Sequence, residues 1–296
     1  MTQDQARLTP LAKPRIAIMG EFSAGKSTLC NLLLRARPLP EKVTATRLPP
    51  VWMSKGPGND HRVMMDGTTA PVIVDALNEM PFEGTRHVRL HFQAEILDHC
   101  DLIDFPGISD PNMDSEVWER VLVEADAVIW LTHATQAWRQ SEAAVWDTVP
   151  EEVRNKSILL MTRFDKLTND SDRRRVVGRV EKETKGLFDT VFPISLTNAI
   201  RGFKDYDLWA SSGAEDFSDH LVDLIGALSA ERAASQASDG SETEQGTVER
   251  PTLVKKVGPS SPHKEAEADA SAARVMPRRV KPASQGRRER PVGISA

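Results

Sequence analysis

Residues 20–27 read GEFSAGKS, and this stretch decides the fold. It fits the pattern G-x-x-x-x-G-K-S; an apolar run, RIAIM at 15–19, precedes it, and leucines at helical spacing follow it. A strand, a glycine-rich loop and a helix in this order form the setting in which a loop wraps around phosphate groups. The sequence therefore predicts a phosphate-binding loop between a strand at 15–19 and a helix at 27–37.

The residue types in this loop suit a purine nucleoside triphosphate with magnesium. Gly20 and Gly25 allow backbone turns that direct successive N–H groups toward phosphates. Lys26 supplies a positive charge for the β and γ phosphates, and the Ser27 hydroxyl is placed to bind magnesium. The alternative is a chance glycine-rich turn, against which the flanking strand and helix argue. The predicted nucleotide-contacting residues of the loop are Gly20, Ser23, Ala24, Gly25, Lys26, Ser27 and Thr28.

A second element, DLIDFPG at 101–107, follows the loop in the chain. Asp104 ends an apolar strand, and it is predicted to hold the magnesium through water. The N–H of Gly107 is predicted to sense the γ phosphate. Taken alone, D-x-P-G is a common turn. After a phosphate-binding loop, the spacing favours a nucleotide-sensing segment.

A third element, MTRFDKL at 161–167, suggests which base is bound. Asp165 can accept hydrogen bonds from N1 and N2 of guanine, a donor pair that adenine lacks, so it favours GTP over ATP. The usual pattern is N-K-x-D; Thr162 and Arg163 depart from it, but the stem of Arg163 can still lie over the base. Ser195 is a candidate for a backbone contact to the base. The alternative is that this segment caps the helix that follows.

The segment at 37–48, RPLPEKVTATRL, is where a threonine of the first switch is expected. Thr44 is the first choice and Thr46 the alternate. Its hydroxyl would complete the magnesium shell while the γ phosphate is present, and its backbone would hold the attacking water. The alternative is a threonine that simply enters a strand. The predicted metal ligands are Ser27, Thr44 and Asp104.

The hydrophobic pattern predicts an α/β fold. From 15 to about 230, apolar runs alternate with amphipathic segments, as in a mainly parallel sheet covered by helices on both faces. Residues 1–13 are predicted to be a flexible N-terminus, 14–230 the domain, and 231–296 a disordered tail, because from Ser235 onward the composition is too polar to bury a core. The predicted strands are 47–53 and 61–65, paired as a hairpin around GPGND, with 86–92, 101–104, 127–132, 158–162 and 190–194.

Bulk properties exclude several function classes. A net charge of -5 argues against nucleic acid as a partner. Cys30 and Cys100 lie in apolar runs without metal-ligand spacing and are predicted to be buried thiols. Neither a signal peptide nor a run of about 18 apolar residues is evident, so a cytoplasmic protein is expected. The basic end at 274–290 is a candidate contact for an anionic membrane, RNA or an acidic protein partner; a merely solvated tail is the alternative.

Tryptophans cluster between 118 and 146. Trp118, Trp130, Trp138 and Trp146 are predicted to be mostly core residues. The alternative for Trp138, which stands beside Arg139 in a loop-like stretch, is that it faces a partner across the nucleotide site.

Taken in order, GEFSAGKST, VTAT, DFPG and TRFD resemble the GTPase domain of the dynamin superfamily, particularly bacterial dynamin-like proteins, over about 14–230. The resemblance implies hydrolysis of GTP to GDP and phosphate, stimulated by a homodimer through the nucleotide face. It implies that Ser23 helps to bind a monovalent cation, K⁺ or Na⁺, and that Thr44 places the catalytic water. The expected catalytic residues are Ser23, Lys26 and Thr44. Ile108 stands where Ras-like enzymes use glutamine, so slow hydrolysis by the isolated protein is expected.

One departure limits the resemblance. Dynamins carry a long helical bundle and stalk, whereas only a low-complexity segment follows residue 230 here. Membrane scission by this chain alone is therefore not expected, although the basic end could bring it to the periphery of a membrane. Two alternatives stay open: a slow nucleotide-dependent interaction module or switch, and an assembly GTPase of the Era-like kind, which shares D-x-P-G.

Overall fold

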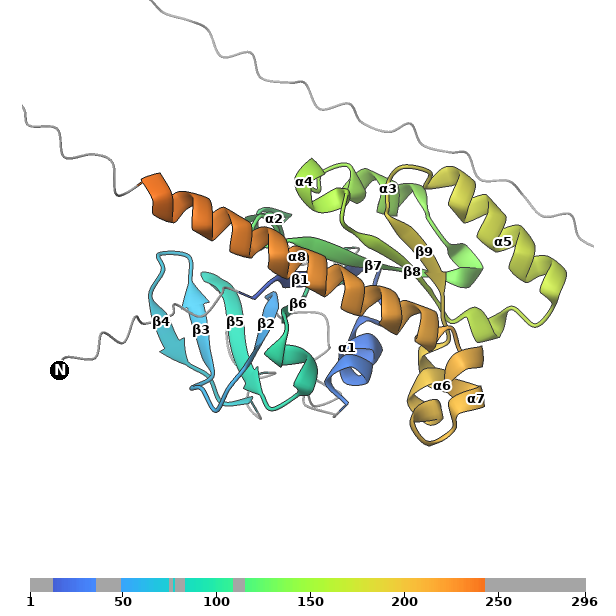
Figure 1. Cartoon of the computed structure of the whole chain (residues 1–296), viewed down its shortest axis with the longest axis horizontal. Helices are drawn as coiled ribbons and strands as arrows, with labels where there is room; N and C mark the ends of the chain where they lie inside the picture. The colour runs from blue at the N-terminus through green and yellow to red at the C-terminus, as the bar shows by residue number, and fades with distance from the viewer. Residues whose placement is uncertain (1–12, 36–48, 75–76, 78–82, 109–114, 243–296) are drawn as a thin grey trace, which may run out of the picture. The chain divides into compact units, whose positions relative to one another are not determined.

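The computed structural model describes residues 13–35, 49–74, 77, 83–108 and 115–242 (Figure 1). The strands are β1 (Arg15–Gly20), β2 (Val51–Lys55), β3 (His61–Met64), β4 (Thr69–Pro71), β5 (Thr85–Phe92), β6 (Asp101–Asp104), β7 (Ala127–His133), β8 (Ile158–Thr162) and β9 (Thr190–Pro193). The α-helices are α1 (Lys26–Leu34), α2 (Ser115–Leu122), α3 (Gln140–Trp146), α4 (Glu151–Arg154), α5 (Asp170–Glu183), α6 (Leu196–Arg201), α7 (Tyr206–Ser211) and α8 (Ala214–Glu242). Short 3-10 helices are η2 (Glu95–Asp98), η3 (Ala134–Gln136), η4 (Phe164–Lys166) and η5 (Gly202–Lys204).

The described residues form one nine-stranded sheet in the order β4-β3-β5-β2-β6-β1-β7-β8-β9. The strands β6, β1, β7, β8 and β9 pair in parallel. The strand β2 runs antiparallel to β6 and joins this parallel half to the extension formed by β5, β3 and β4. Because β6, β1, β7 and β8 point the same way, the segments that follow them meet at one edge of the sheet.

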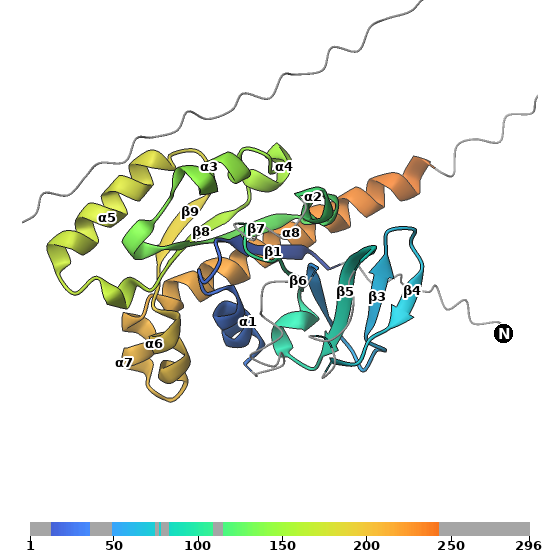
Figure 2. The ribbon, with the colours of Figure 1, turned by 180° about the vertical axis from the view of Figure 1, so that it is seen from behind.

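Helices cover both faces of the sheet, as predicted. Ile16 and Ile18 of β1 face the core that α1, α6 and α8 complete. Ala17 and Met19 alternate with them and face the core that α2, α3, α4 and α5 complete. Figures 1 and 2 show α8 on one side of the sheet and α2 on the other. Cys30 and Cys100 are buried free thiols, as expected.

The predicted hairpin is wrong. Strands β2 and β3 both form, but β5 lies between them in the sheet. The intervening loop crosses the end of β5 instead of returning beside β2: Asp60 Oδ1 accepts a 2.9 Å hydrogen bond from the N–H of His91, and the N–H of Gly56 donates to the carbonyl of Phe92. Turn residues between two strands predict a change of direction but do not name the neighbour.

Helix α8 is longer than the composition of its sequence suggests. It buries Phe217, Leu221, Ile225 and Leu228 at helical spacing, and it continues past residue 230 and past Ser235 to Glu242. Residues 243–296, and with them the predicted basic contact, lie outside the described residues. The part of α8 after residue 230, which the composition predicts as tail, lies beyond these buried residues and needs a source of stability other than apolar burial.

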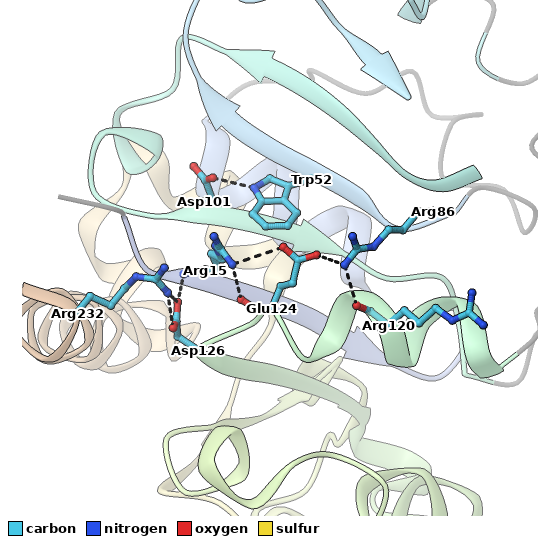
Figure 3. Close-up of polar contacts among 8 residues, drawn as sticks. All are labelled: Arg15, Trp52, Arg86, Asp101, Arg120, Glu124, Asp126 and Arg232. Atoms are coloured by element: carbon cyan, nitrogen blue, oxygen red, sulfur yellow. Dashed lines mark hydrogen bonds and ion pairs between the residues drawn. The ribbon is translucent and has the colours of Figure 1, made fainter. Parts of the chain in front are cut away.

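An ion pair with Asp126, just before β7, supplies it. Arg232 turns from α8 toward Asp126, and its Nη1 lies 2.5 and 2.6 Å from the two carboxylate oxygens (Figure 3). Asp126 Oδ2 also accepts a 2.7 Å hydrogen bond from the backbone N–H of Arg15. Beside it, Glu124 pairs with Arg15 and Arg86. The carboxylate of Asp126 thus joins the far end of α8 to the central strand.

Replacing Arg232 with Ala is expected to lower the free energy of unfolding by about 1–3 kcal/mol, because Asp126 is left mostly buried without its cation. Urea unfolding measures the change. Glu231→Gln is the control: it removes an exposed pair with Lys156 from the same turn of α8, so a loss of about 0.5 kcal/mol or less is expected. Equal losses in the two variants would contradict this role of Arg232.

Candidate functional site

The glycine-rich loop leaves β1 beside β7, and its backbone requires glycine at two positions. Gly20 has a φ of 140°, and a Cβ there would lie 2.1 Å from the carbonyl oxygen of Leu131. Gly25 has a φ of 103°, and a Cβ there would lie 3.1 Å from the side chain of Leu196. Side chains are strained at such φ values. The turns that the loop prediction needs are therefore present and are held between β7 and α6.

Lys26 folds back over this loop. It is the first residue of α1, and its Nζ donates hydrogen bonds to the carbonyls of Gly20 at 3.1 Å and Glu21 at 2.9 Å. Burial lowers the pKa of its ammonium group, while Asp104 acts in the opposite direction. The N-cap of α1 is Gly25, which has no side chain to cap the helix, so in the described part of the chain the first N–H groups of α1 stay available to an anion together with this ammonium.

Asp104 ends β6 between β1 and β2, where Ile18 and Val51 are its strand neighbours. Its Oδ1 is buried and lacks a hydrogen-bond partner in the described part of the chain. Burial raises the pKa of this carboxyl to about 6, and Lys26 opposes the rise. A buried carboxylate oxygen without a donor suits a hydrated divalent cation, so Asp104 is compatible with the predicted magnesium site. Ser27 is the second residue of α1, next to Lys26, and its role as a magnesium ligand stays a prediction.

The raised pKa of Asp104 has a consequence for stability. Since the folded-state pKa lies above the ordinary carboxyl value, its contribution to stability is complete below about pH 4 and is lost as the pH rises through about 6. Asp104→Asn is therefore expected to gain free energy of unfolding relative to wild type between these values, by up to about 3 kcal/mol. Urea titrations without nucleotide or magnesium measure the difference. Profiles of the two proteins that stay parallel from pH 4 to 7 would contradict the prediction.

The segment after Asp104 lies against the glycine-rich loop. The N–H of Phe105 donates to the carbonyl of Ile18 at 3.0 Å, and the N–H of Ile108 donates to that of Gly20 at 3.2 Å. A Cβ on Gly107 would lie 3.0 Å from the backbone of Phe22. This close approach requires the small residue. Gly107 is thus beside the loop, as its predicted role demands.

The segment after β8 also touches the loop. The hydroxyl of Thr162 lies 2.6 Å from the carbonyl of Ala24, and Arg163 Nη2 donates to the carbonyl of Ser23 at 2.8 Å. Asp165 Oδ1 accepts a 2.8 Å hydrogen bond from the hydroxyl of Ser195. The predicted base-binding residues therefore meet at one place, and the Thr162 and Arg163 side chains hold loop carbonyls. Their predicted contact with a base stays a prediction.

Two alternatives from the sequence are wrong. The TRFD segment does not cap the following helix, because Asn169 caps α5 by accepting from the N–H of Asp172. Trp138 does not face outward: its side chain is buried and packs edge to face against Trp130 and Trp146. The ring is buried because it packs with the other two tryptophans, and this packing cannot be read from the neighbouring sequence.

The contact between Glu21 of the loop and α3 was also not predicted. Glu21 Oε1 accepts a 2.8 Å hydrogen bond from the hydroxyl of Ser141, at the start of α3. Glu21 and Ser141 are far apart in the chain, so no clear signal of this contact is present in the sequence.

Thr44 and Thr46 lie outside the described residues, as does the segment 109–114 after Ile108. In the part of the chain that is described, no helix is both long and apolar enough to cross a membrane.

Comparison with known proteins agrees with this geometry. A model of the dynamin family matches residues 16–164. Dynamin-like protein 2 of Campylobacter jejuni is 26% identical over 217 residues, which cover 71% of this chain and 34% of the relative. GTPase Era of Aquifex aeolicus is 23% identical over 189 residues, which cover 61% of this chain and 50% of the relative. The chain thus spans a third to a half of the length of these curated relatives.

Solved structures of an oligomerised bacterial dynamin pair resemble the fold. One chain superposes with a TM-score of 0.56 at 16% identity, over 80% of this chain and 50% of that chain. Another has a TM-score of 0.54 at 19% identity, over 78% of this chain and 38% of that chain. These likenesses confirm the predicted P-loop GTPase fold, and the family match confirms the resemblance drawn from the motifs. Because the family match covers half of the chain, from β1 to Phe164, the chain belongs to the dynamin family.

Proposed function

We propose that this chain binds GTP with magnesium and hydrolyses it to GDP and phosphate. One observation carries the proposal: the buried ammonium of Lys26, at the glycine-rich loop, interacts with the buried carboxylate of Asp104, whose Oδ1 has no hydrogen-bond partner among the described residues. Burial of both charges is unfavourable without a ligand that uses them. A triphosphate with a divalent cation uses both. The cation, when bound, neutralises charge on the phosphates.

The residues of the chain divide the work of binding. The amides of the loop and the start of α1 hold the phosphates, and Lys26 exchanges its two carbonyl partners for the β and γ phosphates. Ser27 and Asp104 hold the cation, and Thr44, with Thr46 as the alternate, completes its shell. Asp165 selects guanine.

Hydrolysis depends on groups that place a water molecule. Ser23 helps to hold a monovalent cation, K⁺ or Na⁺, and the backbone of Thr44 positions the water. Ile108 is half-buried against the core and has no polar group, so it cannot orient water as glutamine does. A second copy across the nucleotide face would order these elements and raise the rate. The dynamin chains that resemble this one are described as oligomerised, which supports this part of the proposal.

The test is phosphate release measured against protein concentration, in potassium and in a bulky organic cation. Specific activity is expected to rise with concentration and to be higher in potassium. A specific activity that does not change with protein concentration in either salt would overturn the proposed roles of the dimer and of the monovalent cation, but not hydrolysis itself. Absence of GTP binding in the presence of magnesium would overturn the whole proposal.

Two other functions have a specific observation behind them. The apolar Ile108 favours a switch that binds GTP and hydrolyses it very slowly, for which micromolar binding without concentration-dependent turnover is expected. The similarity to GTPase Era favours an assembly GTPase. Stimulation by RNA would support that second reading, whereas stimulation by anionic liposomes would support a cytoplasmic dynamin-like protein that works at the periphery of a membrane.

A further inference from the structure

Glu142 is a buried carboxylate near the nucleotide site that the proposed function does not use. It lies in the first turn of α3, and only 1% of its surface is exposed. Its oxygens accept three hydrogen bonds: Oε1 from Trp130 Nε1 at 3.1 Å, and Oε2 from the Thr132 hydroxyl at 3.0 Å and the Arg139 N–H at 2.9 Å. Burial raises its pKa, and these three bonds oppose the rise. Capping a helix start does not require burial, and burying a carboxylate is costly. The burial of Glu142 therefore indicates a role beyond capping α3.

These bonds hold the loop 133–139 in one strained conformation. Trp138 has a φ of 56°, which is unfavourable for a bulky residue. Its N–H donates to the hydroxyl of Thr132 at 2.9 Å, and that hydroxyl in turn donates to Glu142. The Trp138 ring packs against Trp130, Trp146 and Phe188. The strain is therefore balanced by a hydrogen-bond chain that ends on Glu142.

The glycine-rich loop is held at one point by α3 and at a second by β8. Ser141, next to Glu142, donates to Glu21 at 2.8 Å. On the other side, the hydroxyl of Thr162 lies 2.6 Å from the carbonyl of Ala24 and 3.2 Å from that of Thr132. Thr132 thus links the two sides: its hydroxyl donates to Glu142, and its carbonyl lies near the Thr162 hydroxyl that contacts Ala24. The loop is therefore tied to α3 at Glu21, and at Ala24 to the end of β8, which lies against Thr132 of β7.

We propose that Glu142 is a positioning residue for nucleotide binding: it locks the loop 133–139 and the start of α3 against the glycine-rich loop without touching the nucleotide. This inference rests on the proposed GTP-binding function. It predicts that the affinity for nucleotide depends on a carboxylate whose oxygens are all engaged inside the protein. It also predicts that the rate at saturating GTP depends on it much less, because Glu142 does not reach the reacting atoms.

Glu142→Gln tests the inference. Gln has nearly the same size, but its NH₂ replaces one acceptor and leaves at least one of the three donors unmatched. The variant is expected to bind fluorescent GTP and GDP about tenfold more weakly, with kcat at saturating GTP within about threefold of wild type. Thr132→Val removes the hydroxyl that accepts from the N–H of Trp138 and donates to Glu142, and it is expected to weaken binding similarly. Because both act through one chain of bonds, the double variant is expected to be no weaker than the weaker single variant.

Titrations are made well below the melting temperature of each variant, so that lost affinity does not report unfolding. Glu151→Gln, an exposed carboxylate at the start of α4, is the matched control and is expected to bind like wild type. Wild-type protein that binds neither nucleotide overturns the proposed function and the inference together. Normal wild-type binding with equal binding by folded Glu142→Gln overturns the inference alone. If that variant does not fold, Thr132→Val decides: weaker binding supports the inference, and unchanged binding overturns it.

Discussion

Replacing Lys26 with Ala is expected to abolish GTP turnover, with a loss of roughly 10³-fold or more. The ammonium lies at the loop and donates to the carbonyls of Gly20 and Glu21, and a triphosphate can take the place of both partners. Without it, the charge that develops on the phosphates as the bond breaks has no side-chain cation from the loop to stabilise it. Phosphate release under saturating GTP measures the loss.

Binding should fall in the same variant. Magnesium with GTP is expected to raise the melting temperature of wild type, because a ligand that binds the folded state stabilises it. Lys26→Ala is expected to lose most of this rise. Lys185→Ala removes an exposed lysine at the end of α5 and is expected to keep both turnover and the rise. A Lys26→Ala protein that keeps a tenth of wild-type turnover would show that the charge is not used in this way.

Replacing Asp165 with Asn is expected to change the base that is bound. The carboxylate can accept from both N1 and N2 of guanine, and the hydroxyl of Ser195 orients it through Oδ1 at 2.8 Å. Asn offers one acceptor and one donor, which match the N1–H and the C2 carbonyl of xanthine instead. Affinity for GTP is expected to fall by roughly 10³-fold or more, and affinity for xanthosine triphosphate is expected to rise.

Competition of each triphosphate against a fluorescent nucleotide measures this exchange. Asp207→Asn, an exposed carboxylate on α7, is the control and should leave the preference unchanged. ATP should bind weakly to wild type in the same assay. If Asp165→Asn binds GTP as wild type does, the carboxylate does not read the base, and the preference for GTP has to come from elsewhere.

Much of the site can be predicted from the sequence because its requirements are local. Gly20, Gly25 and Gly107 stand where the backbone bends or where another segment comes too close for a side chain. The strands at Asp101–Asp104 and Ile158–Thr162 have the predicted bounds, since apolar runs of this length mark buried strands. Asp104 ends the first of these strands and Asp165 follows the second, at the same edge of the sheet.

Other features depend on partners that are distant in the chain. The GPGND turn predicts a reversal, but β5 takes the place between β2 and β3 because His91 and Phe92 bond to the turn. The Ala- and Ser-rich end of α8 looks like a tail, yet Arg232 reaches Asp126, more than a hundred residues earlier. Trp138 stands in a loop-like stretch, but its ring joins a buried cluster with Trp130 and Trp146.

The sequence by itself determined the phosphate-binding loop, the alternation of strands and helices, and the residues that end the strands beside the site. Only the tertiary structure decided the order of strands in the sheet, the length of α8 and the way Glu142 and Ser141 hold the loop. The reason is physical: backbone conformation and hydrophobic periodicity are set within about ten neighbouring residues, whereas a hydrogen bond or an ion pair between distant residues exists only after the chain has brought them together.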